Sequence, residues 1–262
     1  MIKVLTIAGS DSSGGAGIQA DLKTFSALGT YGMSVITAVT AQNTRGVSSV
    51  RELDPEIIRE QISAIFEDIQ VDAVKIGMVF NTTIIDSIAE ILLKHRIKNI
   101  VVDPVMVSTS GYTLLQPQAR EALIRELFPL AEVVTPNLWE AEVITGEKIS
   151  TLPAMEKAAM TISLLGSKNV VVKGGHLEGD AVDVLYNGKS FRHFFSDRVS
   201  TPHTHGTGCT FSSAIAAFLA KGCPVEEAVA GAKEYINGAI AHAFPLGQGV
   251  GPIHHFYQFY KA

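Results

Sequence analysis

The sequence is poor in cysteine and tryptophan, with two cysteines, Cys209 and Cys223, and one tryptophan in 262 residues. So few cysteines exclude the disulfide framework of a small secreted domain, and no Cys-x-x-Cys or Cys/His spacing indicates a zinc site. No stretch is apolar for long enough to cross a bilayer, and the apolar start breaks at Gly9, too soon for a signal peptide. We therefore expect a cytoplasmic protein.

Runs of lysine or arginine are also absent, and the formal net charge is −5 at pH 7. These features argue against nucleic acid or an anionic membrane surface as the main partner and favour small molecules. The hydrophobic fraction of 47% is high enough for a substantial core. Because there is no internal repeat, low-complexity tract or linker, we predict a single domain over residues 1–262.

Apolar, β-prone runs alternate along the chain with segments of helical spacing. This alternation predicts an α/β fold with a mainly parallel central sheet flanked by helices. Two alternating runs joined by Asn187-Gly188 interrupt the pattern and predict a small β-hairpin at the edge of the sheet. The predicted strands are 3–8, 33–41, 47–53, 73–78, 100–102, 133–135 and 170–173, and the predicted helices are 18–28, 55–68, 82–95, 117–127, one that begins near 137, 207–221 and 225–242.

The stretch 205–210, His-Gly-Thr-Gly-Cys-Thr, precedes an apolar run that predicts a buried helix beginning near Thr207. Its glycines, Gly206 and Gly208, let the backbone approach a ligand closely. Since unpaired N–H groups and the helix dipole favour an anion at a helix N-terminus, this loop is a candidate phosphate site. In that field we expect a lowered pKa for the thiol of Cys209, which makes it a candidate base. The alternative is a glycine-rich turn that carries a small buried cysteine.

A second glycine-rich loop, residues 9–17, follows the first predicted strand. It lacks the Gly-Lys-Ser/Thr end of a P-loop and does not fit Gly-x-Gly-x-x-Gly, so both of these nucleotide fingerprints are set aside. In the helix that follows, the apolar positions leave Asp21 off the main stripe. Asp21 is therefore free to face a ligand, or simply complements the helix N-terminus.

Polar side chains lie at or just after the carboxyl ends of several predicted strands, where open α/β sheets bind ligands. These residues are Gln42, Asp103, Asn137, Glu140 and Lys173. The carboxylates of Asp103 and Glu140 suit Mg²⁺, because a Mg²⁺–ATP site commonly needs only one or two carboxylates. Alternatively, Asp103 is a turn residue before a proline and Glu140 is a first-turn helix carboxylate.

Together these motifs resemble those of the hydroxymethylpyrimidine/phosphomethylpyrimidine kinase family of thiamine biosynthesis, within the ribokinase-like superfamily. The resemblance covers essentially the whole chain and rests on residues 8–23, 41–44, 75–78, 103–106, 135–138, 172–176 and 205–210. It implies a ribokinase-like three-layer sandwich. It also implies ATP-dependent phosphorylation of 4-amino-5-hydroxymethyl-2-methylpyrimidine and then of its monophosphate, with Mg²⁺ as cofactor.

The resemblance further implies which residues form the site. The residues expected to form the pyrimidine pocket are Gly9, Asp21, Gln42, Met78 and Val105. Those expected near the nucleotide are Asp103, Asn137, Glu140, Lys173 and Thr207, with Asp103 and Glu140 also near the metal. The amides of the loop that includes Gly206 and Gly208 would form an anion hole beside Cys209, the catalytic residue, which replaces the aspartate base of most ribokinase relatives.

Several alternatives stay open at this point. Where some relatives carry a basic residue after the Asp103 strand end, this chain has Ser108, Thr109 and Ser110. A pyridoxal kinase of the same branch is the nearest alternative, since Gln42 offers both a donor and an acceptor to either ring. A sugar kinase and a non-catalytic nucleotide-binding regulator fit the motifs less well. The edge hairpin indicates a homodimer, and a monovalent cation is a further candidate cofactor.

Overall fold

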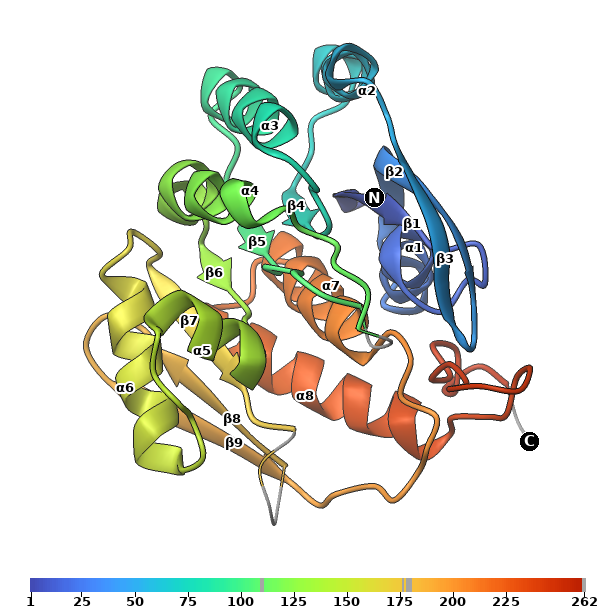
Figure 1. Ribbon diagram of the computed structural model, residues 1–262, viewed down its shortest axis with the longest axis vertical. Helices are drawn as coiled ribbons and strands as arrows, with labels where there is room; N and C mark the ends of the chain where they lie inside the picture. Colours follow the sequence, from blue (N-terminus) through green and yellow to red (C-terminus); the bar gives the residue numbers. More distant parts are fainter. Residues whose placement is uncertain (109–110, 176, 178–180, 261–262) are drawn as a thin grey trace.

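The computed structural model describes residues 1–108, 111–175, 177 and 181–260 (Figure 1). Within these residues the chain forms a nine-stranded sheet with the order β3-β2-β1-β4-β5-β6-β7-β8-β9. The strands are β1 (Lys3–Ser10), β2 (Tyr31–Asn43), β3 (Gly46–Glu52), β4 (Ala73–Ile76), β5 (Ile100–Val102), β6 (Val133–Val134), β7 (Asn169–Lys173), β8 (Ala181–Tyr186) and β9 (Phe191–Ser196). The predicted α/β architecture is confirmed.

Helices cover both faces of this sheet and complete three layers (Figure 1). The helices are α1 (Gly17–Ala27), α2 (Pro55–Asp68), α3 (Thr82–Lys94), α4 (Pro117–Ala122), α5 (Leu138–Thr145), α6 (Leu152–Ser163), α7 (Thr207–Ala220) and α8 (Val225–Ala241). Helices α2 to α6 pack on one face, whereas α1, α7 and α8 pack on the other. A π-helical turn (Leu123–Leu127) continues α4.

The central strands are parallel and lie between the two helical layers. Strands β2, β1, β4, β5, β6 and β7 pair in parallel, and β4, β5 and β6 are buried throughout. Their valine- and isoleucine-rich sequences suit this position, because β-branched side chains pack well on a sheet that is covered on both faces. All six central strands therefore point their carboxyl ends toward the same edge of the sheet.

Antiparallel strands close both sides of the sheet. Strand β3 pairs antiparallel with β2, and the hairpin β8–β9 pairs antiparallel with β7. The hairpin lies at the predicted edge, and Gly188 in its turn has φ of +84°. The Asn187 side chain accepts hydrogen bonds from the two amides that follow this glycine, which fixes the turn.

One helix was not predicted. The sequence analysis placed a single helix between the strands that contain Val134 and Val170, whereas the structure has two, α5 and α6. Helix α6 begins with the Thr151 side chain accepting from the Ala154 amide, and it buries Met155, Ala158, Ala159 and Ile162. In the described part of the chain, no helix combines the length and the apolar character needed to cross a bilayer.

Candidate active site

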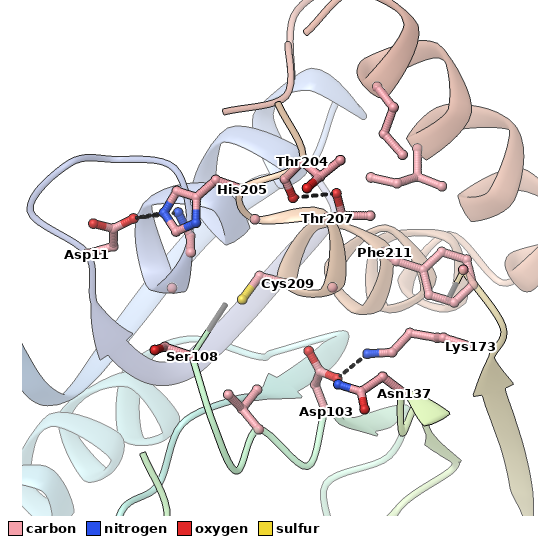
Figure 2. A pocket seen from close by; sticks show the side chains of 18 of the residues that line it. Asp11, Asp103, Ser108, Asn137, Lys173, Thr204, His205, Thr207, Cys209 and Phe211 are labelled. Atoms are coloured by element: carbon pink, nitrogen blue, oxygen red, sulfur yellow. Dashed lines mark hydrogen bonds and ion pairs between the residues drawn. The ribbon is translucent and has the colours of Figure 1, made fainter. Parts of the chain in front are cut away.

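The carboxyl ends of the parallel strands open into a cavity of about 400 Å³, a size typical of small-molecule sites. Figure 2 shows Cys209 between the Asp11–His205 pair and the Asp103–Lys173 pair. The predicted site residues that line the cavity are Gly9, Gln42, Met78, Asp103, Val105, Asn137, Glu140, Lys173, Gly206, Thr207, Gly208 and Cys209. Thr109 and Ser110, in the loop after Asp103, and His176, in the motif 172–176, lie outside the residues that the structure describes.

Asp11 organises the glycine-rich loop between β1 and α1. Its carboxylate accepts hydrogen bonds from the amides of Ser13, Gly15 and Ala16 and lies 2.8 Å from Nε2 of His205. Burial raises the pKa of Asp11, but the hydrogen bonds from His205 and Ser13 outweigh burial and hold it at about 2. The carboxylate therefore stays charged and ties this loop to the loop that precedes α7.

Gly206 brings these two loops into direct contact. Its φ of +86° is in the left-handed region, and a Cβ at this position would collide with the carbonyl oxygen of Gly15. Only glycine meets both requirements. The turn delivers the N-terminus of α7 to the cavity, as the sequence predicted.

The backbone amides at the start of α7 differ in whether they are free to bind a ligand. The Thr207 amide and hydroxyl both donate to the carbonyl oxygen of Thr204, at 3.3 and 2.7 Å. In the part of the chain that the structure describes, the amides of Gly208 and Cys209 have no backbone acceptor. The anion hole expected along this loop therefore has fewer free N–H groups than predicted, because the Thr207 amide already donates to Thr204.

Asp103 and Lys173 form an ion pair at the ends of two central strands, with 2.8 Å between Nζ and Oδ1. Asp103 also accepts hydrogen bonds from the hydroxyls of Thr135 and Ser212. Burial lowers the pKa of Lys173, but the charges of Asp103 and Glu140 outweigh it, so the pKa is raised and the ammonium persists. A Cβ on Gly208 would lie 3.5 Å from Lys173 Nζ, which places this cation beside the start of α7.

Glu140 lies in the first turn of helix α5, where it completes the N-terminal capping box, and it also lines the cavity. Its Oε2 accepts from the Asn137 amide at 2.8 Å, and its own amide donates to Asn137 Oδ1 at 2.8 Å, which completes a capping box. Burial raises the pKa of Glu140 to about 7, and Asp103 adds to this rise against the opposing effect of Lys173. Burial therefore outweighs the stabilising effect of the Lys173 charge on the Glu140 carboxylate.

An apolar wall and one amide face each other in the other half of the cavity. Met78 packs with Ala38, Leu114 and Val105, and a Cβ on Gly9 would collide with the methyl group of Met78. Gln42 lies at the end of β2, where its Oε1 accepts from the Thr40 hydroxyl and its Nε2 lies 3.5 Å from Nε2 of His205. This half suits a small, partly apolar ring that offers hydrogen-bonding groups at its edge.

The prediction that Asp21 faces a ligand is wrong. Asp21 is fully buried beneath the cavity, and its two oxygens accept from Lys75 Nζ, the Thr6 hydroxyl and the Ser213 hydroxyl. These contacts occupy its acceptor sites, so none is left for a substrate. Position on a helical stripe did not reveal the buried lysine opposite.

The predicted lowering of the Cys209 pKa is also wrong. Burial raises the pKa of this thiol to about 11, although the charge of Lys75 and the Gly17 amide that hydrogen-bonds to the sulfur act in the opposite direction. Burial has the larger effect on the pKa, because the loss of thiolate hydration destabilises the charged form more than Lys75 and the Gly17 amide stabilise it. Cys209 is a thiol at neutral pH.

Sequence reasoning missed Lys75, which lines the cavity although its side chain has no exposed surface. A usable signal was present, since lysine is seldom found inside a strand as apolar as Ala73–Ile76. It also missed the contacts of residues 249–251 behind the site. Gly251 accepts from the His205 amide, and the Val250 amide donates to the carbonyl oxygen of Thr44.

Comparison with known proteins extends this picture. A family model for phosphomethylpyrimidine kinase matches residues 11–254. A hydroxymethylpyrimidine/phosphomethylpyrimidine kinase of Rhizobium meliloti is 55% identical over 261 residues and covers 98% of both chains. The thiamine biosynthesis bifunctional protein ThiED of Geobacter sulfurreducens is 54% identical over 253 residues. The aligned region covers 96% of this chain but only 52% of that protein, so the chain spans about half the length of this relative.

Among solved structures, an ADP complex of Bacillus subtilis pyridoxal kinase matches with a TM-score of 0.92 and 46% sequence identity. The match covers 98% of this chain and 98% of the pyridoxal kinase. These findings confirm the fold and the resemblance predicted from the motifs. The chain is a kinase, and it belongs to the phosphomethylpyrimidine kinase family.

Proposed function

We propose that this kinase transfers a phosphoryl group from ATP to the hydroxymethyl group of 4-amino-5-hydroxymethyl-2-methylpyrimidine, and then transfers a second one to the monophosphate. The observation that best supports this proposal is that three features meet in one cavity. They are the Cys209 thiol, the amides at the N-terminus of α7 that have no backbone acceptor among the described residues, and the Asp103–Lys173 ion pair. The name of the Rhizobium meliloti relative states both activities for that protein.

Transfer of a phosphoryl group requires a place for developing negative charge. The amides of Gly208 and Cys209 and the positive end of α7 would stabilise the transferring group, and the Lys173 ammonium lies close by. These groups would act in both transfers, because both move a phosphoryl group along the same cavity.

The first transfer also requires removal of the hydroxyl proton of the substrate. Cys209 is the candidate base, and its Sγ would take the proton while the oxygen attacks phosphorus. The acceptor in the second transfer is a phosphate oxygen that is already ionised at neutral pH, so it needs no base. A thiol with a pKa of about 11 gives little thiolate at neutral pH, but that thiolate is strongly basic.

The carboxylates present fit Mg²⁺. Asp103 and Glu140 are both buried, and both line the cavity with carboxyl oxygens, the donors that Mg²⁺ prefers. Among the described residues, no group of three or more His, Cys, Asp or Glu side chains is arranged so that it could hold a metal ion. When bound, Mg²⁺ would neutralise phosphate charge at Asp103 and Glu140.

The pyrimidine would lie against Met78 and Val105, with Gln42 hydrogen-bonded to its edge. Asp21, which the sequence analysis placed in this pocket, has no role in contacting the ring. The high similarity to Bacillus subtilis pyridoxal kinase makes pyridoxal the second candidate substrate, because its ring also bears a hydroxymethyl group.

A product assay with Mg²⁺–ATP tests this proposal. The purified protein is incubated separately with hydroxymethylpyrimidine, with its monophosphate and with pyridoxal, and the products are quantified. Conversion of both pyrimidines with much slower conversion of pyridoxal is the expected result. Conversion of pyridoxal alone would overturn the substrate assignment, and no turnover of any of the three would overturn the catalytic one.

A further inference from the structure

A fully buried ion pair lies under the cavity. Lys75 Nζ is 2.9 Å from both oxygens of Asp21, and neither side chain has any exposed surface. Asp21 also accepts from the hydroxyls of Thr6 and Ser213, each at 2.6 Å. Burying two charges is unfavourable unless their geometry and hydrogen bonding are good, so this arrangement needs an explanation beyond packing.

The pair is connected to the helix that carries Cys209. Ser213 follows Cys209 by four residues on α7, so the two side chains lie on one face of the helix, one turn apart. The Ser213 hydroxyl donates to Asp21 Oδ1, the same oxygen that Lys75 contacts. The Asp21–Lys75 pair is therefore tied to α7 at Ser213, one helical turn after Cys209.

The surroundings leave room for the ammonium. A Cβ on Gly77 would lie 2.8 Å from Lys75 Nζ, so a larger residue would displace the lysine head. Asp21 fixes the other side of the ammonium, and Lys75 and Cys209 both line the cavity. The fold thus keeps a fixed positive charge facing the thiol.

We propose that Lys75, held in place by Asp21, is a positioning residue that stabilises the deprotonated state of Cys209. This inference rests on the proposed function, in which Cys209 accepts the hydroxyl proton in the first transfer. It also gives Asp21 a role: the carboxylate orients the lysine rather than the substrate.

Four charged groups face Cys209 in the described part of the chain. They are Lys75 from β4, Lys173 from β7, Asp21 from α1 and Asp103 after β5. Burial is the main reason why the pKa of the thiol is raised, and Lys75 is the largest influence that lowers it. Burial also acts on Lys75, but Asp21 outweighs it and the pKa of Lys75 is raised, so the ammonium remains charged.

Alkylation of Cys209 by iodoacetamide tests the inference without any substrate. The rate is measured against pH in a Cys223→Ser background, because these are the only two cysteines in the sequence. Lys75→Met removes the charge, Lys75→Arg keeps it, and Asp21→Asn/Lys75→Met removes both charges together. The double variant matters because a neutral pair of similar volume is tolerated where a single buried charge is not.

Lys75→Met should slow alkylation at a fixed pH by about tenfold or more, which corresponds to a rise of about one unit in the thiol pKa. Lys75→Arg should restore much of the rate, and the double variant should show a smaller decrease in the same direction. If Lys75→Met folds and its alkylation rate is unchanged, the inference is overturned. If Lys75→Met does not fold, an unchanged alkylation rate in the double variant overturns it.

Kinetics of the same variants separate this inference from the function on which it rests. Lys75→Met should reduce the first transfer more than the second. Slower alkylation together with equal losses in both transfers would support the effect of Lys75 on the thiol, and it would overturn the base role of Cys209.

Discussion

Nε2 of His205 lies 2.8 Å from Oδ2 of Asp11, across 194 positions of sequence, and this contact joins the two glycine-rich loops of the active site. The same carboxylate holds the amides of Gly15 and Ala16. Since Gly206 packs directly on the Gly15 carbonyl, the position of the α7 N-terminus depends on this contact. One carboxylate therefore links the loop after β1 to the loop before α7 at the edge of the cavity.

Asp11→Asn should reduce the free energy of unfolding by about 2 kcal/mol at pH 7. The pKa of Asp11 is lowered from 3.8 to about 2 in the folded protein. Its stabilisation is therefore complete above pH 3.8 and is lost as the pH falls toward 2. Urea unfolding at pH 7 and at several acidic pH values measures the difference between the two proteins, and a difference that does not shrink below pH 3.8 would contradict this account.

Cys209→Ala should reduce kcat of the first transfer by about 10²- to 10⁴-fold, the usual contribution of a general base, and affect the second transfer much less. In the unaltered enzyme the first transfer should accelerate about tenfold per pH unit below the thiol pKa of about 11, because the thiolate fraction rises with pH. Single-turnover rates for each acceptor measure both effects, with Cys223→Ala as the control. Equal losses in the two transfers would leave Cys209 as a packing or anion-hole residue.

Gly206→Ala should impair both transfers and destabilise the fold. Gly222→Ala is its matched control, because Gly222 has a φ of +87° but no atom within 4 Å of an added Cβ. Both variants carry the cost of a left-handed alanine, about 1 kcal/mol, whereas only Gly206→Ala adds the collision with Gly15. Thermal unfolding and kcat/KM for ATP distinguish them, and equal behaviour of the two variants would refute the role of the loop contact.

Lys173→Met should reduce kcat/KM of both transfers by about 10²- to 10³-fold, as expected when a group that stabilises transition-state charge is removed. Lys168→Met serves as the control, because Lys168 immediately precedes the same strand and pairs with Glu132 at the surface. Steady-state kinetics with each acceptor measure kcat/KM for both transfers in the two variants. A loss confined to one transfer would mean that Lys173 does not act on the shared phosphoryl group.

The sequence predicted most of the fold and the place of the site because both depend on local patterns. Short apolar strands that alternate with helices require parallel pairing, and parallel strands bring their carboxyl ends together. Asp103, Asn137 and Lys173 lie at the carboxyl ends of three predicted strands, so the sequence placed them at one edge of the sheet. The structure adds that these three strands are neighbours.

The errors arise from interactions between distant segments. The helix dipole argument for Cys209 considered only its own helix, whereas burial by the surrounding elements decides the thiol pKa. Asp21 and Lys75 are separated by 54 positions, and no spacing rule connects a helix carboxylate to a lysine in a strand. Helix periodicity indicated which face of α1 carries Asp21 but not what that face meets.

The contacts of residues 249–251 have a consequence for the timing of assembly during protein synthesis. The His205 amide donates to Gly251, and the Val250 amide donates to Thr44 two residues after Gln42. A growing chain on the ribosome contains β1, β2 and the glycine-rich loop long before residue 251 has emerged. The nascent protein can thus make every strand of the sheet, the last of which ends at Ser196, before residues 249–251 are available to brace its active site.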